Sequence, residues 1–157
     1  SRGLGDVYKR QYQDIPSDNL PVVESSDGKV WAKVVAGEAM GAKAVIDTVI
    51  PIQFVHYRMK DNSSLTHQIS ADLNGMIYMF GGEAKVSGKT VQDGQLVLLT
   101  VGDEVEITTT KGAEFLILAG PEINEPIARY GPFVMNTRQE IHQAVTDFQN
   151  GTFAQIS

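Results

Sequence analysis

The sequence predicts an all-β protein, an antiparallel barrel or sandwich that ends in one α-helix. Three observations predict this class. Short segments rich in β-branched and aromatic residues recur along the chain, turn dipeptides containing glycine separate them, and a helical period is found only near the C-terminus. The chain has 157 residues, of which 42% are hydrophobic, and this is enough to form the core of one domain.

The first part of the chain lacks such segments. Residues 1–11 show no clear apolar period and resemble a translated adapter sequence, so we expect a non-native leader there. Residues 12–28 contain short polar clusters and two prolines, which is typical of a connector. The predicted domain therefore covers residues 29–157.

Alternation with a period of two predicts the strands. Within residues 52–59, Val55, Tyr57 and Met59 fall on one face and His56 falls on the other. This pattern indicates a strand whose two faces lie in different environments.

Residues 75–80 are almost all apolar, which indicates a strand buried on both faces, and Gly81-Gly82 is expected to end it. The dipeptides Ser87-Gly88 and Asp93-Gly94 are typical of turns. The predicted strands are 29–36, 43–50, 52–59, 65–69, 75–80, 83–86, 95–100, 104–109 and 114–119.

The terminal helix is predicted over residues 138–149. Thr137 and Glu140 have the spacing of a capping box, in which each side chain binds a backbone N–H of the first turn. Asn150-Gly151 supplies a left-handed stop. The apolar stripe of this helix consists of Ile141, Ala144, Val145 and Phe148.

Several stretches resemble one family. Residues 125–144, EPIARYGPFVMNTRQEIHQA, resemble the C-terminal segment of the pirins, which are two-domain cupin proteins. The sequences YQDIP at 12–16, PVVE at 21–24 and AGE at 36–38 resemble the stretch that joins the two pirin domains. The resemblance implies that residues 29–157 form a C-terminal cupin-type β-barrel and that the chain is truncated at its N-terminus.

The resemblance also implies a function. Pirins bind iron, and bacterial members are associated with quercetin 2,3-dioxygenase activity at a metal in the N-terminal barrel. We therefore expect the intact parent to be a metal-dependent dioxygenase using Fe(II) or another divalent metal. We expect the present chain to be a non-catalytic structural domain, without a cofactor of its own, whose partner is the missing N-terminal cupin domain. The alternative is an interaction module, because animal pirins are linked to transcription regulation through partner proteins.

Composition excludes several classes of function. The formal net charge of −6 disfavours direct binding to nucleic acid, since phosphate contacts need a basic face. The absence of cysteine excludes disulfides, thiolate catalysis and thiolate metal sites. No apolar run approaches the roughly 18 residues of a membrane span, and no secretory leader is visible, so we expect a cytoplasmic protein.

The candidate metal ligands are His56, His67 and Glu83. A cupin site typically begins with a His-x-His pair, and His67 holds the first position of such a pair, but Ile69 holds the second and has no lone pair to donate. His142 is the only histidine farther along and falls on the terminal helix. The sequence therefore predicts no catalytic or metal-binding residue in this chain.

Three polar residues lie close to the terminal helix: Arg129, Tyr130 and Arg138. We expect Arg129 and Tyr130 to hold the segment before the helix against the barrel through hydrogen bonds, with partner binding as the alternative role. A solvated strand edge is expected for Glu104, Glu106 and Glu114.

Overall fold

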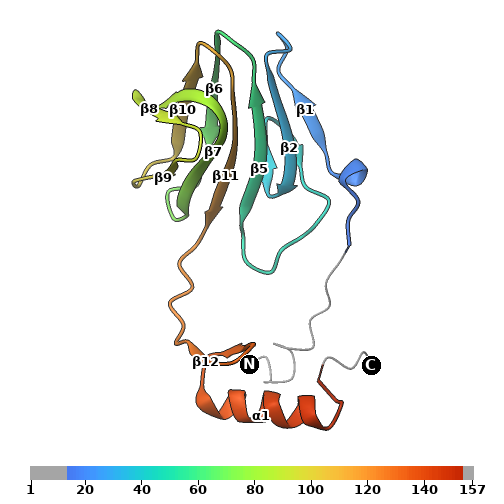
Figure 1. The fold of residues 1–157 in the computed structure, drawn as a ribbon. Coiled ribbons are helices and arrows are strands. Elements are labelled where there is room, and N and C mark those ends of the chain that lie inside the picture. The colour runs from blue at the N-terminus through green and yellow to red at the C-terminus, as the bar shows by residue number, and fades with distance from the viewer. Residues whose placement is uncertain (1–13, 154–157) are drawn as a thin grey trace. The chain divides into compact units, whose positions relative to one another are not determined.

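The computed structural model describes residues 14–153 (Figure 1). The predicted leader at residues 1–11 lies outside them. The chain divides into two compact units, one over residues 15–122 and one that contains residues 123–153. Each is described here by itself.

The larger unit is built from antiparallel strands. Its elements are η2 (Ser17–Asn19), β1 (Val22–Glu24), β2 (Val30–Ala36), β3 (Glu38–Ala39), β4 (Ala42–Lys43), β5 (Gln53–Met59), β6 (Ser63–Gln68), β7 (Asn74–Val86), β8 (Lys89–Gln92), β9 (Leu96–Leu98), β10 (Glu104–Thr109) and β11 (Ala113–Gly120). β1 forms within the segment predicted as a connector and pairs with β2.

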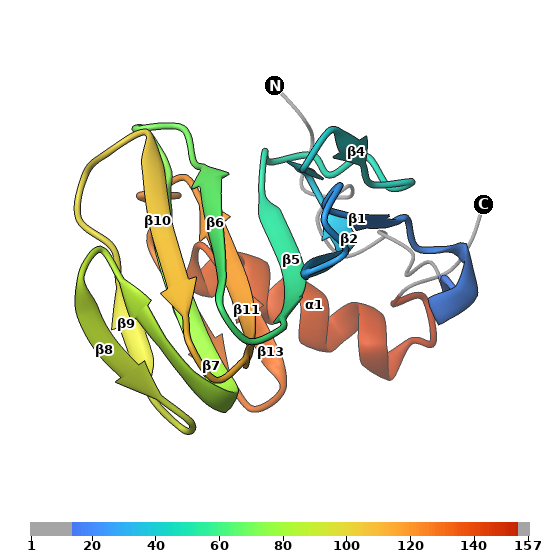
Figure 2. The same ribbon diagram turned by 90° about the horizontal axis from the view of Figure 1, so that it is seen from above.

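The strands of the main sheet follow the order β1-β2-β5-β11-β7-β10-β6, and β8 and β9 also pair with β7. The sheet curls into a half-barrel (Figure 2). The long strand β7 makes this possible, because its first part pairs with β11 and its last residues pair with β8 and β10. The predicted all-β antiparallel fold with one terminal helix is confirmed.

The predicted strand over residues 43–50 is wrong beyond Lys43. β4 ends at that residue, and the following segment has no strand. Val45 and Val49 are mostly exposed, at 58% and 64% of their surface. β-branched residues favour a strand only where a neighbouring strand pairs with them, and among the described residues no strand pairs with this loop.

Two predictions about residues 75–80 are also wrong. Gly81-Gly82 does not end the strand, because β7 continues to Val86. Gly82 has a φ of +73°, and the register to β11 shifts close to it, between Met79 and Gly81, so the strand bends around this glycine pair and continues. Burial alternates along β7 instead of covering both faces, so only one face of the strand is in the core.

The core fills the inside of the half-barrel. Its members come from the inward positions of each strand, as the period of two requires. The largest completely buried side chains are Tyr57, Phe115, Ile77, Met79, Ile107, Ile117, Val34 and Val55. The prediction that Val55, Tyr57 and Met59 share one face is confirmed, and that face is the interior.

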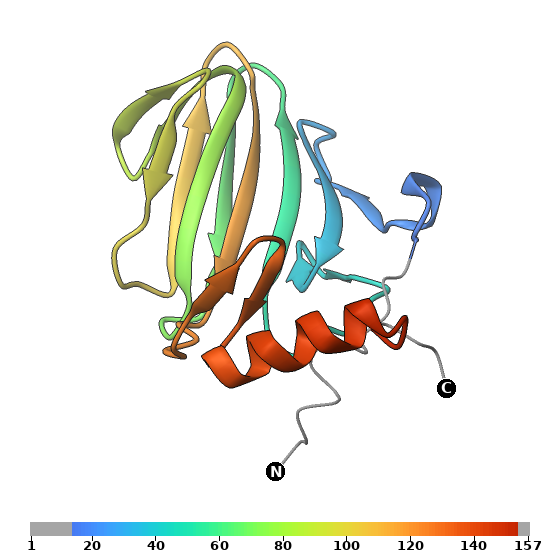
Figure 3. The same ribbon diagram turned by 60° about the horizontal axis from the view of Figure 1, so that its bottom comes forward.

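The smaller unit is a hairpin with a helix. β12 (Ala128–Tyr130) and β13 (Phe133–Met135) pair antiparallel, and α1 covers Arg138–Gln149 as predicted. Figure 3 shows α1 lying along the hairpin. The rings of Phe133 and Phe148 meet edge to face at 5.8 Å, which joins strand and helix. Among the described residues, no helix has the length and apolar character that crossing a bilayer requires.

Candidate functional site

A hydrogen-bonded group of three side chains lies inside the half-barrel. Tyr57 on β5 and His67 on β6 both point inward because they occupy inward positions of their strands. The Tyr57 hydroxyl lies 2.8 Å from Nδ1 of His67, and Nε2 of His67 lies 3.2 Å from Oε1 of Gln53. We call Gln53, Tyr57 and His67 the seam cluster.

The seam cluster has one consistent arrangement of protons. The Gln53 amide nitrogen donates to the carbonyl of Gln68 at 3.2 Å, so its oxygen faces His67 as an acceptor. Nε2 of His67 therefore carries the hydrogen, and Nδ1 accepts from the Tyr57 hydroxyl. Burial raises the pKa of Tyr57 above its ordinary value, which keeps this hydroxyl protonated.

His67 is held in its neutral form. Only 3% of its surface is exposed, and this burial lowers its pKa to about 4, because an imidazolium would lose its hydration there. At neutral pH the ring is thus an uncharged bridge between two strands.

The interior of this half-barrel does not fit a divalent metal. The one ring nitrogen of His67 that could donate a lone pair already accepts from Tyr57. The buried side chain of Ile69 follows two positions later and offers no donor. Across residues 14–153, no three His, Asp or Glu side chains gather where they could hold an ion. A cupin metal site needs several such donors converging on one point.

The candidate His56 lies on the opposite side of the sheet from His67. It is on β5 next to Tyr57 and therefore faces outward. Its Nε2 lies 2.8 Å from Oε1 of Glu114, and Nε of Arg58 donates to the same oxygen at 2.7 Å. The hydrogen bond from Arg58, followed by that from His56, lowers the pKa of Glu114.

The prediction of a solvated strand edge is wrong for Glu114, because β11 has a neighbour on each side, β5 and β7. Glu104 and Glu106 are exposed, and β10 pairs with β7 only at Ile107 and Thr108. The Arg58 guanidinium also lies 5.0 Å from the centre of the Trp31 ring. The outer face of the sheet thus carries an ion pair beside an aromatic ring.

The third candidate, Glu83, also lies outside the interior. It precedes Ala84, which is buried, so its carboxylate is on the outer side of β7. It accepts from the Gln92 amide at 2.9 Å and lies 3.9 Å from Nζ of Lys111. The structure therefore places His56, His67 and Glu83 in three separate environments.

Within the smaller unit the side chains of Arg129 and Tyr130 are exposed. Inside this unit, Asn136 holds the segment before the helix: its amide donates to Glu125 at 2.8 Å and to the Pro126 carbonyl at 2.9 Å. The predicted capping box of Thr137 and Glu140 is present and continues this network.

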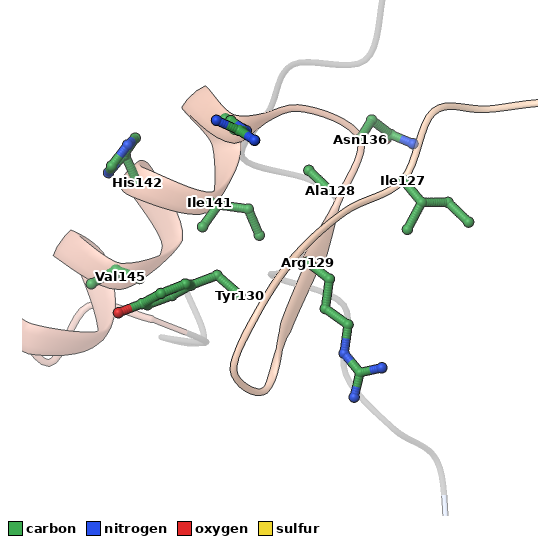
Figure 4. Close-up of a pocket in the computed structure, with 9 residues that line it drawn as sticks. Ile127, Ala128, Arg129, Tyr130, Asn136, Ile141, His142 and Val145 are labelled. Atoms are coloured by element: carbon green, nitrogen blue, oxygen red, sulfur yellow. The ribbon is translucent and has the colours of Figure 1, made fainter.

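The smaller unit contains a hollow of about 700 Å³ between α1 and β12 (Figure 4). One wall is a row on the helix, Arg138, His142 and Val145, at spacings of four and three residues. The Tyr130 ring lies alongside Val145 on the opposite wall, whereas the Arg129 side chain extends away from the helix. The full lining is Ile127, Ala128, Arg129, Tyr130, Asn136, Arg138, Ile141, His142 and Val145.

Sequence reasoning missed the partners that decide the role of His67. Tyr57 was placed on one face with Val55 and Met59, and Gln53 has the same parity four residues earlier, so alternation could have placed Gln53 on that face too. The sequence of neither strand contains a pattern that predicts the approach of β6 to β5 across the barrel.

The curled antiparallel sheet and the helix define a cupin-type domain, and similarity to known proteins gives the family. The profile of the Pirin C-terminal cupin domain matches residues 54–154. The chain belongs to the pirin family.

Individual relatives agree with this assignment. The chain is 31% identical to pirin from Homo sapiens over 155 residues, covering 95% of this chain and 53% of that protein. It is 35% identical to a putative pirin-like protein from Arabidopsis thaliana, covering 88% and 53% of the two chains. The chain thus spans about half the length of the curated relatives it matches.

A solved structure gives the same result. Quercetin 2,3-dioxygenase from Acinetobacter baumannii superposes with a TM-score of 0.79 at 28% identity, covering 94% of this chain and 52% of that one. A putative quercetin 2,3-dioxygenase from Vibrio cholerae is 29% identical over 148 residues. The chain is therefore a pirin-like cupin domain related to proteins named quercetin 2,3-dioxygenase.

Proposed function

We propose that this chain is a structural, non-catalytic cupin domain of a pirin-type protein. In a protein as long as its relatives, it would pack against an N-terminal cupin domain and stabilise it. That companion domain would hold Fe(II) or another divalent metal and carry a quercetin 2,3-dioxygenase type of oxygenation.

One observation carries this proposal. The only interior histidine, within the part of the chain that the structure describes, has both ring nitrogens engaged by Tyr57 and Gln53. A side chain used in this way links strands and supplies no lone pair to a metal or a substrate. Kinship to proteins named quercetin 2,3-dioxygenase supports the activity proposed for the whole protein, and the coverage of about half their length supports a companion domain.

Metal loading and turnover test the proposal. The purified chain is incubated anaerobically with Fe(II), freed of unbound metal, and analysed for iron, and quercetin consumption in air is then followed by absorbance. The dioxygenase from Acinetobacter baumannii is the positive control. We expect iron far below one ion per chain and no turnover. Stoichiometric iron, or turnover that survives removal of trace contaminants, would overturn the structural role.

A further inference from the structure

One margin of the main sheet has no strand beside it. β9 (Leu96–Leu98) pairs with the first part of β7 and, among the described residues, with no other strand. Figure 2 shows β8 and β9 together at the margin of the curled sheet. A strand in this position presents a row of backbone N–H and C=O groups to any chain that lies next to it.

The hydrogen bonds to β7 use alternate residues of this segment. The C=O of Gln95 accepts from β7 at 3.0 Å, and the N–H of Leu99 donates to β7 at 2.9 Å. Because hydrogen-bonded positions alternate along an antiparallel pair, Val97 also bonds to β7, and the backbone groups of Leu96 and Leu98 point away from it. The free edge of β9 therefore consists of the N–H and C=O groups of these two leucines.

The side chains along this free edge are apolar and exposed. Leu96 and Leu98 are 55% and 72% exposed, and they lie across from Tyr78 and Met76 on the outer face of the sheet. Residues 94–102 contain no charged residue and no proline, although these are the usual means by which proteins protect such an edge.

The other marginal strands of the larger unit are more polar. β6 exposes Ser64, Thr66 and Gln68, β1 ends in Glu24, and β8 begins with Lys89. Within the described residues of this unit, β9 is thus the strand at which unpaired backbone groups and exposed leucines coincide.

We propose that β9 pairs with β9 of a second copy of this chain, antiparallel and about a two-fold axis through Val97. In this register Leu96 lies opposite Leu98 of the second copy, and the two residues exchange both of their backbone hydrogen bonds. The same exchange occurs on the other side of the axis. Every free N–H and C=O group of β9 then has a partner, and leucine faces leucine on the outer face.

Charge favours a second copy as the occupant of this edge. Each copy has a formal net charge of −6, so contacts through charged surfaces would bring like charges together. The uncharged run at residues 94–102 avoids this. One short strand covers little area, so we expect a weak and reversible dimer, as at other small interfaces. The pairing does not depend on whether the half-barrel binds metal.

The first test measures association of the full chain by sedimentation velocity, from low micromolar concentration to about 1 mM. We expect an equilibrium between monomer and dimer. Amide hydrogen exchange followed by NMR at both ends of this range locates the contact. The amides of Leu96 and Leu98 should gain protection at high concentration, whereas the amide of Val97, already bonded to β7, should be protected at both.

Charges placed at the two facing positions test the register. Leu96→Lys together with Leu98→Lys puts like charges opposite each other, and so does the pair Leu96→Glu and Leu98→Glu, so each double variant should associate about tenfold or more weakly. An equal mixture of the two should form a heterodimer, although both chains remain net negative. Leu96→Glu together with Leu98→Lys should associate alone, because the antiparallel register places opposite charges face to face.

The matched control is Val45→Lys together with Val49→Lys. These side chains are 58% and 64% exposed in the loop after β4, so the same two charges should change association less than about twofold. Thermal unfolding of each variant confirms that the fold is retained.

Four results would overturn the proposal. They are a chain that stays monomeric to about 1 mM, particles that grow beyond a dimer, equal weakening by the control variant, and failure of the lysine and glutamate variants to associate on mixing.

Discussion

The Tyr57 hydroxyl donates to Nδ1 of His67 across the inside of the half-barrel at 2.8 Å. The two residues belong to β5 and β6, which are not neighbours in the sheet. The two rings also meet edge to face at 5.6 Å. This contact, together with the one between His67 and Gln53, joins β6, at one end of the curled sheet, to β5, which lies nearer the other end.

Removing the Tyr57 hydroxyl should destabilise the larger unit. Tyr57→Phe leaves Nδ1 of His67 buried without a donor, and we expect a loss of about 1–3 kcal/mol in the free energy of unfolding by urea. Tyr78→Phe removes the same atom from a ring that is 39% exposed on the outer face, and it should change the free energy by less than about 0.5 kcal/mol. Equal effects of the two variants would contradict the bridging role.

His67 should make stability depend on pH. Its folded pKa is about 4, below the value of about 6.5 for an unfolded chain, so the unfolded state takes up a proton first as pH falls. The free energy of unfolding should fall between about pH 6.5 and pH 4, by an amount on the order of 3 kcal/mol.

The control for this dependence is His67→Gln, which can still accept from Tyr57 and donate to Gln53 but does not titrate. Urea unfolding of both proteins at several pH values isolates the contribution of His67 as a difference. A difference that stays constant from pH 7 to pH 4 would refute the assignment of a buried, neutral imidazole.

The bend in β7 can be tested with two glycines of similar backbone conformation. Gly82 and Gly88 have φ values of +73° and +80°. A Cβ at Gly82 would collide with the carbonyl oxygen of Gly112, whereas a Cβ at Gly88 would meet nothing within 4 Å. Gly88→Ala should cost about 1 kcal/mol from backbone strain alone, and Gly82→Ala should cost clearly more.

Thermal unfolding of the two alanine variants measures this difference. The larger loss at Gly82 follows because the collision is with backbone, which cannot move without disturbing the pairing of β7 with β11. Equal midpoints for the two variants would mean that the bend does not need a glycine at this position.

The capping box should stabilise α1 against local unfolding. Thr137→Ala removes the side chain that accepts from the backbone N–H of Glu140, and we expect about 1 kcal/mol less protection of the α1 amides in hydrogen exchange. Thr146→Ala, within the same helix, removes a hydroxyl that bonds only the His142 carbonyl, and it should leave protection unchanged or higher. Equal loss of protection would contradict the capping role.

Local features were predicted correctly from sequence. The helix bounds at 138 and 149 follow from Thr137, Glu140 and the apolar period, all of which act within a few residues. The shared face of Val55, Tyr57 and Met59 follows in the same way from alternation.

Features that depend on a distant strand were not predicted. Residues 43–50 have the composition of a strand but no strand beside them after Lys43, and Gly82 continues β7 because Gly112 lies opposite the bend. The candidate site shows the same limit. His67 was recognised as a possible ligand, but its partner Tyr57 arrives from another strand through the curl of the sheet.

The most direct test of the structural role of this domain is a long-range proton–nitrogen NMR spectrum of the histidine rings at pH 7, before and after addition of Zn(II). We predict that His67 is a neutral ring with hydrogen on Nε2 and that its two nitrogen signals do not move when the metal is added. A zinc-induced shift of Nδ1 of His67, accompanied by release of the Tyr57 hydroxyl, would contradict the account.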